Sequence, residues 1–257
     1  MKCVILRSIF QSLDARVLNS LIISHCSELV VTVDIRRFSK LMVLEMYNST
    51  VTEWSSISSL SLPYFPFLTT LFFVRSQLKG GLPEGITSDL SPDIIDIEFV
   101  ATDLGGPLPD DLDKKWPSVV MLYLEHCELQ EFPSVLSNMG LTDLSLADNN
   151  ISVVPDSLSD SSMYVMLDHN PLDSIPDSFG SLNQLVCLTT QYTNVATLPL
   201  WLSKSVDIKY RARGTPYCRD LQSDSPEAVF ASCAMDDSSN GIFPLAMRDR
   251  DRSFRAD

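Results

Sequence analysis

The chain has 257 residues, of which 45% are hydrophobic and 20% are charged, a composition that allows a large buried core and excludes a disordered chain. Asp and Glu number 33 against 19 Lys and Arg, so the formal net charge is -14 and the phosphate backbone of a nucleic acid is an unfavourable partner. No apolar run approaches the ~18 residues that a membrane-spanning helix requires.

Residues 1–17 combine a basic residue with an apolar patch, as a secretory signal does. Arg7, Gln11 and Asp14 interrupt the patch early, and no small-residue cleavage site follows, so a signal peptide is not predicted. The segment is expected to be a partial repeat or an N-terminal flank. In the first case the sequence would be part of a longer chain.

The stretch from Leu141 to Leu158 carries the clearest pattern in the chain. Its apolar residues fit neither a helical period nor a simple alternating strand, and they follow the scheme LxxLxLxxNxLxxLPxxL. This scheme resembles the leucine-rich repeat, in which a short strand turns at an Asn and returns through a Pro-containing segment to complete one coil. Because one coil cannot close a core alone, the resemblance implies further coils on both sides.

Nine positions, Leu146 among them, align on the second leucine of that strand at intervals of 21 to 27 residues. They are Ile23, Met46, Phe73, Phe99, Leu124, Leu146, Leu167, Thr190 and Ala212. Repeats of this family are about 20 to 29 residues long, so about nine coils are expected over residues 18–216. The resemblance implies an α/β leucine-rich-repeat solenoid, a right-handed superhelix with a curved parallel sheet on its concave face and irregular or 3-10 segments on its convex side. Leu122, Leu144 and Leu167 are expected to be buried and stacked on one another.

The repeat signal is strongest in coils three to seven, and in each of the first seven coils a small polar side chain or a cysteine occupies the position of the repeat Asn. These ladder residues are Cys26, Ser49, Ser76, Thr102, Cys127, Asn149 and Asn170. In the family this side chain satisfies backbone groups of the turn, and all of these residue types can do so. The spacing of Cys26 and Cys127 matches no zinc pattern, so both are interpreted as ladder residues.

The return segments are of two kinds. Residues 78–86, LKGGLPEGI, and residues 104–112, LGGPLPDDL, contain Gly before LPxxL and resemble the repeats of extracellular receptors. The later segments are shorter and resemble a type found both outside and inside cells.

Residues 217–235 are expected to cap the exposed end of the array. Cys218 and Cys233 flank an amphipathic segment there, and the resemblance to the cysteine caps of extracellular repeat proteins implies a disulfide between them. The alternative is a cytosolic cap with two reduced cysteines. Residues 236–257 alternate in charge without periodicity and are expected to be a mobile tail.

Two N-glycosylation sequons begin at Asn48 and Asn150. With the cysteine cap they favour an extracellular or cell-surface glycoprotein, and a cytoplasmic protein is the alternative.

Ligand binding is expected on the concave face, where the residues between the strand leucines point away from the core. The candidate ligand-binding residues are Glu45, Tyr47, Phe72, Glu98, Tyr123, Glu125, His126, Asp148, Tyr164, Asp168, His169 and Tyr192. Aromatic rings among carboxylates suit a protein or peptide ligand, with a basic one favoured, although a merely solvated face is the alternative. The hot spot is predicted around Tyr123, Glu125, Asp148, Tyr164 and Asp168. Lys209, Arg211 and Arg213 would add a basic edge, or pair with Asp220 and Asp224 of the cap.

The common catalytic and nucleotide-binding motifs GxxxxGK[ST], GxSxG, HExxH and CxxC are absent from the sequence. We therefore predict no enzymatic activity, cofactor or metal, although Asp148 could bridge His126 and His169 around a metal ion if the three side chains form one row. The predicted function is that of a recognition module of a surface or secreted protein, and a cytosolic signalling scaffold or regulatory subunit is the alternative.

Overall fold

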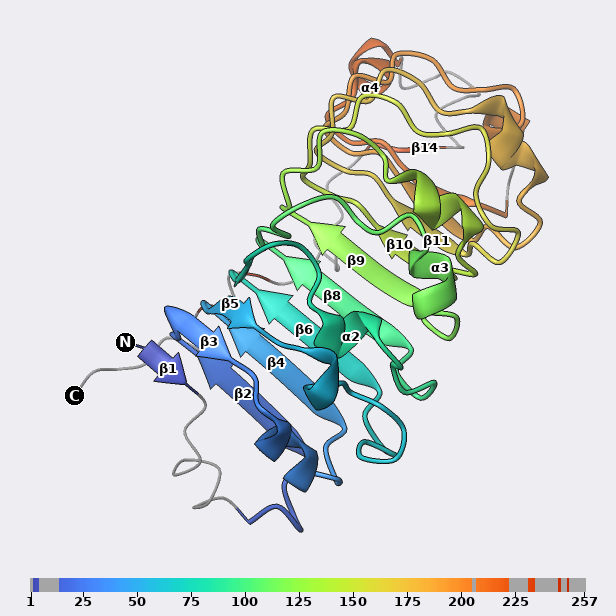
Figure 1. Cartoon of the computed structure of the whole chain (residues 1–257). Coiled ribbons are helices and arrows are strands. Elements are labelled where there is room, and N and C mark those ends of the chain that lie inside the picture. Colours follow the sequence, from blue (N-terminus) through green and yellow to red (C-terminus); the bar gives the residue numbers. More distant parts are fainter. Residues whose placement is uncertain are drawn as a thin grey trace. The chain divides into compact units, whose positions relative to one another are not determined.

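The structure is a computed structural model that describes residues 2–4, 14–204, 207–221, 231–233, 245 and 249 (Figure 1). It divides into two compact units. Unit 1 comprises Met1–Val119 and Phe243–Asp257, and unit 2 comprises Val120–Ile242. Among the described residues, no helix is long and apolar enough to cross a membrane.

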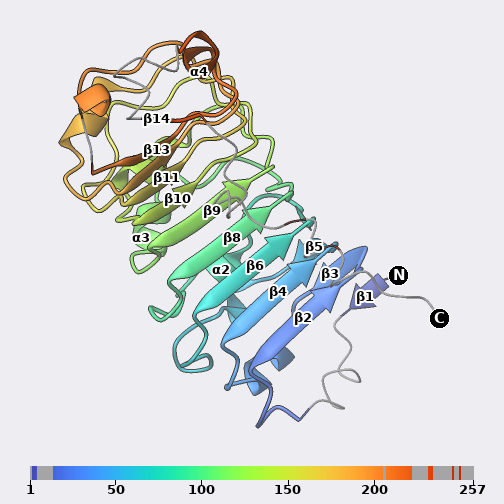
Figure 2. The same cartoon turned by 180° about the vertical axis from the view of Figure 1, so that it is seen from behind.

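Unit 1 contains two sets of parallel strands, which Figure 2 shows from the side opposite to Figure 1. The first is ordered β2 (Ser20–Ser24), β4 (Val43–Tyr47), β6 (Thr70–Val74) and β8 (Asp96–Val100). The second, formed by the return segments, is ordered β1 (Lys2–Val4), β3 (Glu28–Val30), β5 (Thr50–Glu53) and β7 (Gln77–Leu78). Short helices complete the coils: η1 (Val33–Arg37), η2 (Ser56–Ser58), α2 (Glu84–Thr87) and α3 (Leu112–Lys115). β1 pairs in parallel with β3, so residues 2–4 extend the sheet that the return segments form.

Unit 2 continues the repeat with shorter strands. They are β9 (Met121–Glu125), β10 (Asp143–Ser145), β11 (Tyr164–Met166), β12 (Cys187–Thr189), β13 (Lys209–Arg211) and β14 (Ala231–Ser232), and consecutive strands pair in parallel. The helices are η3 (Ser134–Asn138), η4 (Asp177–Ser181), η5 (Leu202–Lys204) and α4 (Pro216–Asp220).

The residues at all nine aligned positions are buried, with at most 9% of their surface exposed. In unit 1 the pairing places Ile23, Met46, Phe73 and Phe99 in one row. In unit 2 Leu144 pairs with Leu122 and Val165. The predicted stack of Leu122, Leu144 and Leu167 is thus wrong in its third member, because Leu167 is buried two residues further along, in line with Leu146. A step of two residues keeps the same face of the strand, so the error does not change which side is buried.

Large aromatic rings fill the longest coils of unit 1. The Phe73 ring stacks on Phe99 at 4.8 Å between ring centroids, and the Trp116 ring stacks on Phe99 at 6.4 Å. The indole N–H of Trp116 donates to the carbonyl oxygen of Ile86 at 2.6 Å, which satisfies the one polar atom of this buried ring. The receptor-like Gly of the next return segment also has a structural role: Gly105 has φ +71° and lies so close to Leu78 that a Cβ would overlap its carbonyl oxygen.

The ladder residues connect neighbouring coils through the backbone. Asn149 Nδ2 donates to the carbonyl oxygens of Leu124 and Leu146 at 2.7 and 2.9 Å, while its Oδ1 accepts from the N–H of Cys127 at 3.1 Å. In unit 1 Thr102 Oγ1 donates to Phe73 O at 2.7 Å and accepts from the N–H of Ser76 at 3.3 Å. Each side chain therefore satisfies backbone groups that the turn leaves without a strand partner.

The residue just before each ladder position has a left-handed backbone conformation in all nine coils. We call these residues the turn row: His25, Asn48, Arg75, Ala101, His126, Asp148, His169, Tyr192 and Gly214, with φ between 45° and 77°. Eight of the nine are not glycine, so the fold imposes this conformation at a cost to the residue. The turn row is a line of residues along one edge of the sheet in each unit.

Candidate functional site

Apart from Asp168, which lies in the turn just after β11, the predicted ligand-binding residues lie in the turn row or on the strands of both units, on the face of each sheet opposite the buried leucines. We call this the non-core face. Their exposure differs from one residue to the next. Glu45, Tyr47, Glu98, Glu125 and Asp168 are buried, Phe72, Tyr123, His126 and Asp148 are half-buried, and Tyr164, His169 and Tyr192 are exposed.

Four of the predicted acidic residues are therefore not available at the surface. Glu125 is fully buried and accepts a hydrogen bond from Ser145 Oγ. Asp168 is also fully buried and accepts from the backbone and side-chain N–H groups of Gln191. Burial raises the pKa of the Asp168 carboxyl, and the hydrogen bonds from Gln191 oppose this only in part. The expectation of an exposed acidic face is corrected: alternation assigned these side chains to the right face but not to solvent.

The turn row of unit 2 brings together the polar and aromatic residues that are accessible. His126 Nδ1 lies 2.8 Å from Asp148 Oδ2. In the following coils the His169 ring stacks on Tyr192 at 4.5 Å between centroids, and the guanidinium of Arg213 lies 5.5 Å from the Tyr192 ring centroid. Each side chain is held by a neighbour from an adjacent coil, so the row presents a preorganised surface with an acidic end and a cationic, aromatic end.

The alternative of a metal bridged by Asp148 is not supported by this geometry. Asp148 pairs with His126, whereas His169 is engaged with Tyr192. Within the described parts of the chain, no group of three or more His, Cys, Asp or Glu residues is arranged to hold a metal ion.

The basic edge is divided between surface and interior. Lys209 is exposed and Arg213 is half-buried, but only 8% of Arg211 is exposed. Asp220 is exposed in α4, and Asp224 lies outside the described residues.

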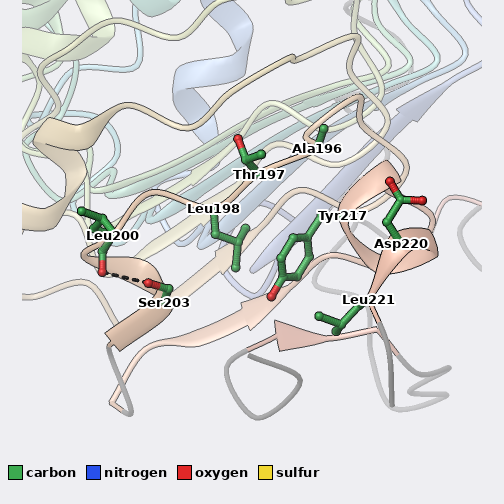
Figure 3. Close-up of a pocket in the computed structure, with 8 residues that line it drawn as sticks. All are labelled: Ala196, Thr197, Leu198, Leu200, Ser203, Tyr217, Asp220 and Leu221. Carbon is green, nitrogen blue, oxygen red and sulfur yellow. Dashed lines mark hydrogen bonds between the residues drawn. The ribbon is translucent and has the colours of Figure 1, made fainter. Parts of the chain in front are cut away.

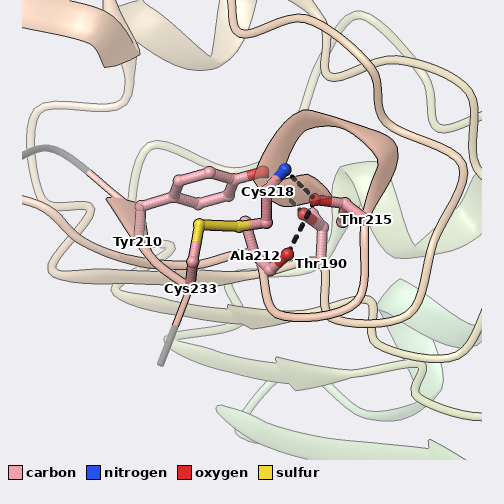
Figure 4. Close-up of a disulfide and its surroundings, with 6 residues drawn as sticks. All are labelled: Thr190, Tyr210, Ala212, Thr215, Cys218 and Cys233. Atoms are coloured by element: carbon pink, nitrogen blue, oxygen red, sulfur yellow. Dashed lines mark hydrogen bonds between the residues drawn. A yellow bond between two sulfur atoms is a disulfide. The ribbon is translucent and has the colours of Figure 1, made fainter. Parts of the chain in front are cut away.

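The cap of unit 2 contains the predicted disulfide, which joins Cys218 to Cys233 across 5.6 Å between Cα atoms (Figure 4). Thr215 Oγ1 accepts from the N–H of Cys218 at 3.2 Å and so caps α4. Beside the disulfide, Tyr210 fills the core next to the small Ala212, and its hydroxyl lies 2.7 Å from Thr190 Oγ1. This hydrogen bond explains why a polar Thr replaces the aliphatic residue of the repeat at position 190.

A depression of about 350 Å³ lies next to α4 (Figure 3). Leu198, Leu200 and Leu221 contribute apolar surface to it, together with Tyr217, and Asp220 lies at its edge. Ser203 Oγ donates to the Leu200 carbonyl at 3.0 Å. The lining offers apolar contact but no paired acid and base.

Both sequons lie at the surface. Asn48 is exposed in the turn row, with Nδ2 2.8 Å from His25 Nδ1. Asn150 is exposed after the ladder residue of its coil, and its Nδ2 donates to Gln130 Oε1 at 2.8 Å.

The sequence prediction missed Val74, Arg75 and Val100, which lie on or beside the non-core face of unit 1. Val74 and Val100 are fully buried there, and Arg75 pairs with Asp249 of the C-terminal segment. Val74 and Val100 share the register position of Tyr47, and Arg75 shares the turn-row position of Asn48. These shared positions were the signals that could have identified the three residues.

No protein-family model and no curated protein sequence matches the chain. Several solved structures are similar to the chain. The chain is similar to an internalin-like protein of Listeria monocytogenes (TM-score 0.53, 21% identity, 78% of this chain and 61% of that one) and to InlP of the same bacterium (0.53, 18%, 78% and 64%). It is also similar to the leucine-rich-repeat ectodomain of the receptor kinase GASSHO1/SCHENGEN3 from Arabidopsis thaliana, solved in complex with CASPARIAN STRIP INTEGRITY FACTOR 2 (0.54, 17%, 77% and 24%).

The chain therefore has the leucine-rich-repeat fold, as the repeat pattern predicted. It spans less than two thirds of the length of each of these three proteins.

Proposed function

We propose that the chain is a non-enzymatic recognition module that binds a protein or peptide through the non-core face and the adjoining turn row. The observation that carries this proposal is the preorganised turn row of unit 2, in which Tyr192 is 44% exposed while His169 and Arg213 hold its ring. Rigid aromatic side chains supply contact area at a small entropic cost, which is why they are frequent hot-spot residues. The Arabidopsis receptor ectodomain, which has the same fold, was solved in complex with CASPARIAN STRIP INTEGRITY FACTOR 2, and this supports a binding role.

We propose that the ligand of unit 2 is basic, as the sequence favoured. The net charge of -14 would steer a basic partner towards the protein, and the half-buried Asp148 would meet it at the acidic end of the turn row.

We propose further that the protein works outside the cell or on its surface. The Cys218–Cys233 disulfide supports this location, because disulfides persist in oxidising compartments. The exposed Asn48 and Asn150 would be accessible to glycosylation. A thiol titration of the unfolded, unreduced protein should find four of the six cysteines free. Six free thiols would favour the cytosolic scaffold.

The binding proposal can be tested with ligands selected from a displayed peptide library against the full chain. Tyr192→Ala should weaken binding about tenfold or more, because it removes an aromatic anchor. The matched control is Tyr64→Ala in the segment between η2 and β6: Tyr64 is 38% exposed and also has a guanidinium over its ring, that of Arg36 at 3.8 Å.

The acidic end is tested by Asp148→Asn, which should slow association at low salt, against Asp156→Asn and Asp177→Asn on the return segments. If the changes at positions 64, 156 and 177 weaken binding and those at 148 and 192 do not, the recognition surface lies elsewhere.

A further inference from the structure

An apolar row crosses the non-core face of unit 1. Tyr47, Val74 and Val100 occupy the same register position on β4, β6 and β8. At most 5% of each side chain's residue surface is exposed, although the core leucines lie on the opposite side of the strands. Leu245 of the C-terminal segment packs against this row together with Phe72. The non-core face of unit 1 thus holds an aliphatic side chain that comes from the far end of the sequence.

The same segment also supplies a carboxylate to the turn row. Asp249 accepts hydrogen bonds from Arg75 Nε and Nη2, each at 2.7 Å, and one from Tyr47 Oη at 2.9 Å. The fork of the guanidinium meets both carboxylate oxygens, which is the geometry of specific carboxylate recognition. These hydrogen bonds, chiefly that from Arg75, hold the pKa of the Asp249 carboxyl below its usual range, so it is charged at neutral pH.

The two anchors have a spacing that suits a helix. Leu245 and Asp249 are four positions apart, and both have helical backbone conformation. Side chains at this spacing lie on one side of a helix, so one helical turn can deliver both groups at once. Apolar contact and a charged fork together require a partner that carries both features at a fixed distance.

We propose that Tyr47, Phe72, Val74, Arg75 and Val100 form a docking patch for a helical peptide with an aliphatic side chain and a carboxylate four residues later, and that the chain's own Leu245 and Asp249 occupy this patch in cis and compete with such a peptide. The inference rests on the proposed function, because it assigns ligand chemistry and regulation to the non-core face. Its ligand chemistry differs from that of the unit 2 turn row, since Arg75 selects a carboxylate.

Anisotropy of a fluorescent peptide with the sequence of residues 243–257 tests the proposal on the full chain. The unaltered chain should bind the peptide weakly, because its own segment is present at a high effective concentration. A full chain carrying Leu245→Asp and Asp249→Lys should release the patch and bind the peptide about tenfold more tightly or better. Adding Arg75→Ala should remove that gain, and a peptide with the Asp249→Ala change should not bind.

A second measurement does not depend on the double variant. Arg75→Ala alone changes an exposed side chain and should increase hydrogen exchange within residues 243–257 while leaving the melting temperature within a few degrees. Arg219→Ala, at an exposed position in α4, is the matched control and should change neither. If the opened chain binds the peptide no better than the unaltered chain, or if Arg75→Ala leaves exchange of the segment unchanged, the proposal is overturned.

The outcome of this experiment can be distinguished from the outcome of the test of the proposed function, because either proposal can fail without the other. Failure of the peptide to bind, with selected ligands still sensitive to Tyr192→Ala, would remove the docking patch alone. Peptide binding that depends on Arg75, with selected ligands insensitive to Tyr192→Ala, would retain the docking patch and remove the turn row as a recognition surface.

Discussion

Asp168 lies in the turn just after β11, at a position where a carboxylate would normally be solvated, yet its side chain has no exposed surface. Burial raises its pKa above the value of about 3.9 expected in the unfolded chain. Between these two pKa values the folded state binds more protons than the unfolded state. The free energy of unfolding therefore falls as pH rises through this window, and the loss is complete above the folded-state pKa.

We expect Asp168→Asn to increase the free energy of unfolding at neutral pH and to flatten its dependence on pH above 4. Asn can still accept the backbone N–H of Gln191, and it has no charge to desolvate. Urea unfolding at several pH values measures both effects. The exposed Asp156→Asn is the control and should stay within about 0.5 kcal/mol of the unaltered protein. A variant that is less stable at neutral pH would show that Asp168 is needed in its charged form.

At the scale of the structural element, each coil requires a left-handed backbone conformation at one residue, its member of the turn row. Ala101 has φ 50° without a side chain that could gain a compensating contact beyond Cβ. A left-handed conformation costs an L-residue about 1 to 2 kcal/mol, and glycine avoids this cost at the expense of a more flexible unfolded chain.

Ala101→Gly is therefore expected to stabilise unit 1 by roughly 0.5 to 1 kcal/mol, whereas Ala101→Val should destabilise it by at least about 1 kcal/mol because a branched side chain crowds this backbone further. Ala196→Gly is the matched control: Ala196 is exposed and its φ is not positive, so the change should be destabilising by about 0.5 to 1 kcal/mol. Equal effects at positions 101 and 196 would mean that the left-handed turn stores no strain.

The coils were predictable from sequence because the spacing of the leucines indicates directly which side chains are buried in the core. The ladder residues were predictable for a related reason: Ser49, Thr102 and Asn149 share the ability to bond backbone groups in a tight turn. The candidate site was less predictable. Alternation states which face a side chain occupies, but the burial of Glu45 and Glu125 depends on neighbours that the pattern does not specify.

The contacts of the C-terminal segment could not be predicted from the repeat pattern, for a different reason. Residues 236–257 lack periodicity, which favoured a mobile tail, yet Leu245 and Asp249 contact β4 and the turn row. Two contact residues are too few to produce a periodic pattern that a sequence analysis could detect. The other residues of that segment lie outside the described part of the chain.

At the scale of the whole molecule, each coil is stabilised mainly by its neighbours, so an end of the array depends on its cap. The Cys218–Cys233 bridge closes a segment of 15 residues, for which the chain-entropy estimate is about 3 kcal/mol. The bridge joins α4 to the end of β14, and β14 pairs with β13, so the disulfide holds the last strands of unit 2 together.

Reduction should increase hydrogen exchange in β13 and β12 before it affects β9 within the same unit. The measurement is native-state exchange with and without reductant. A Cys218→Ser and Cys233→Ser double variant should reproduce the reduced pattern and no longer respond to reductant. A uniform loss of protection from β9 to β13 would show that the disulfide does not act as a local cap.

The contact of Asp249 with the first coils also has a consequence for the order in which the protein assembles. Tyr47 and Asp249 are 202 positions apart, whereas the ladder bond from Asn149 to Leu124 spans 25. Closing the longer loop costs more entropy and is slower, so the coils of unit 1 can form before the C-terminal segment docks. During synthesis at about 5 to 20 residues per second, the docking patch emerges many seconds before its own tail. A partner with the same two anchors would meet no competitor in that interval, so newly made chains are the population most open to capture.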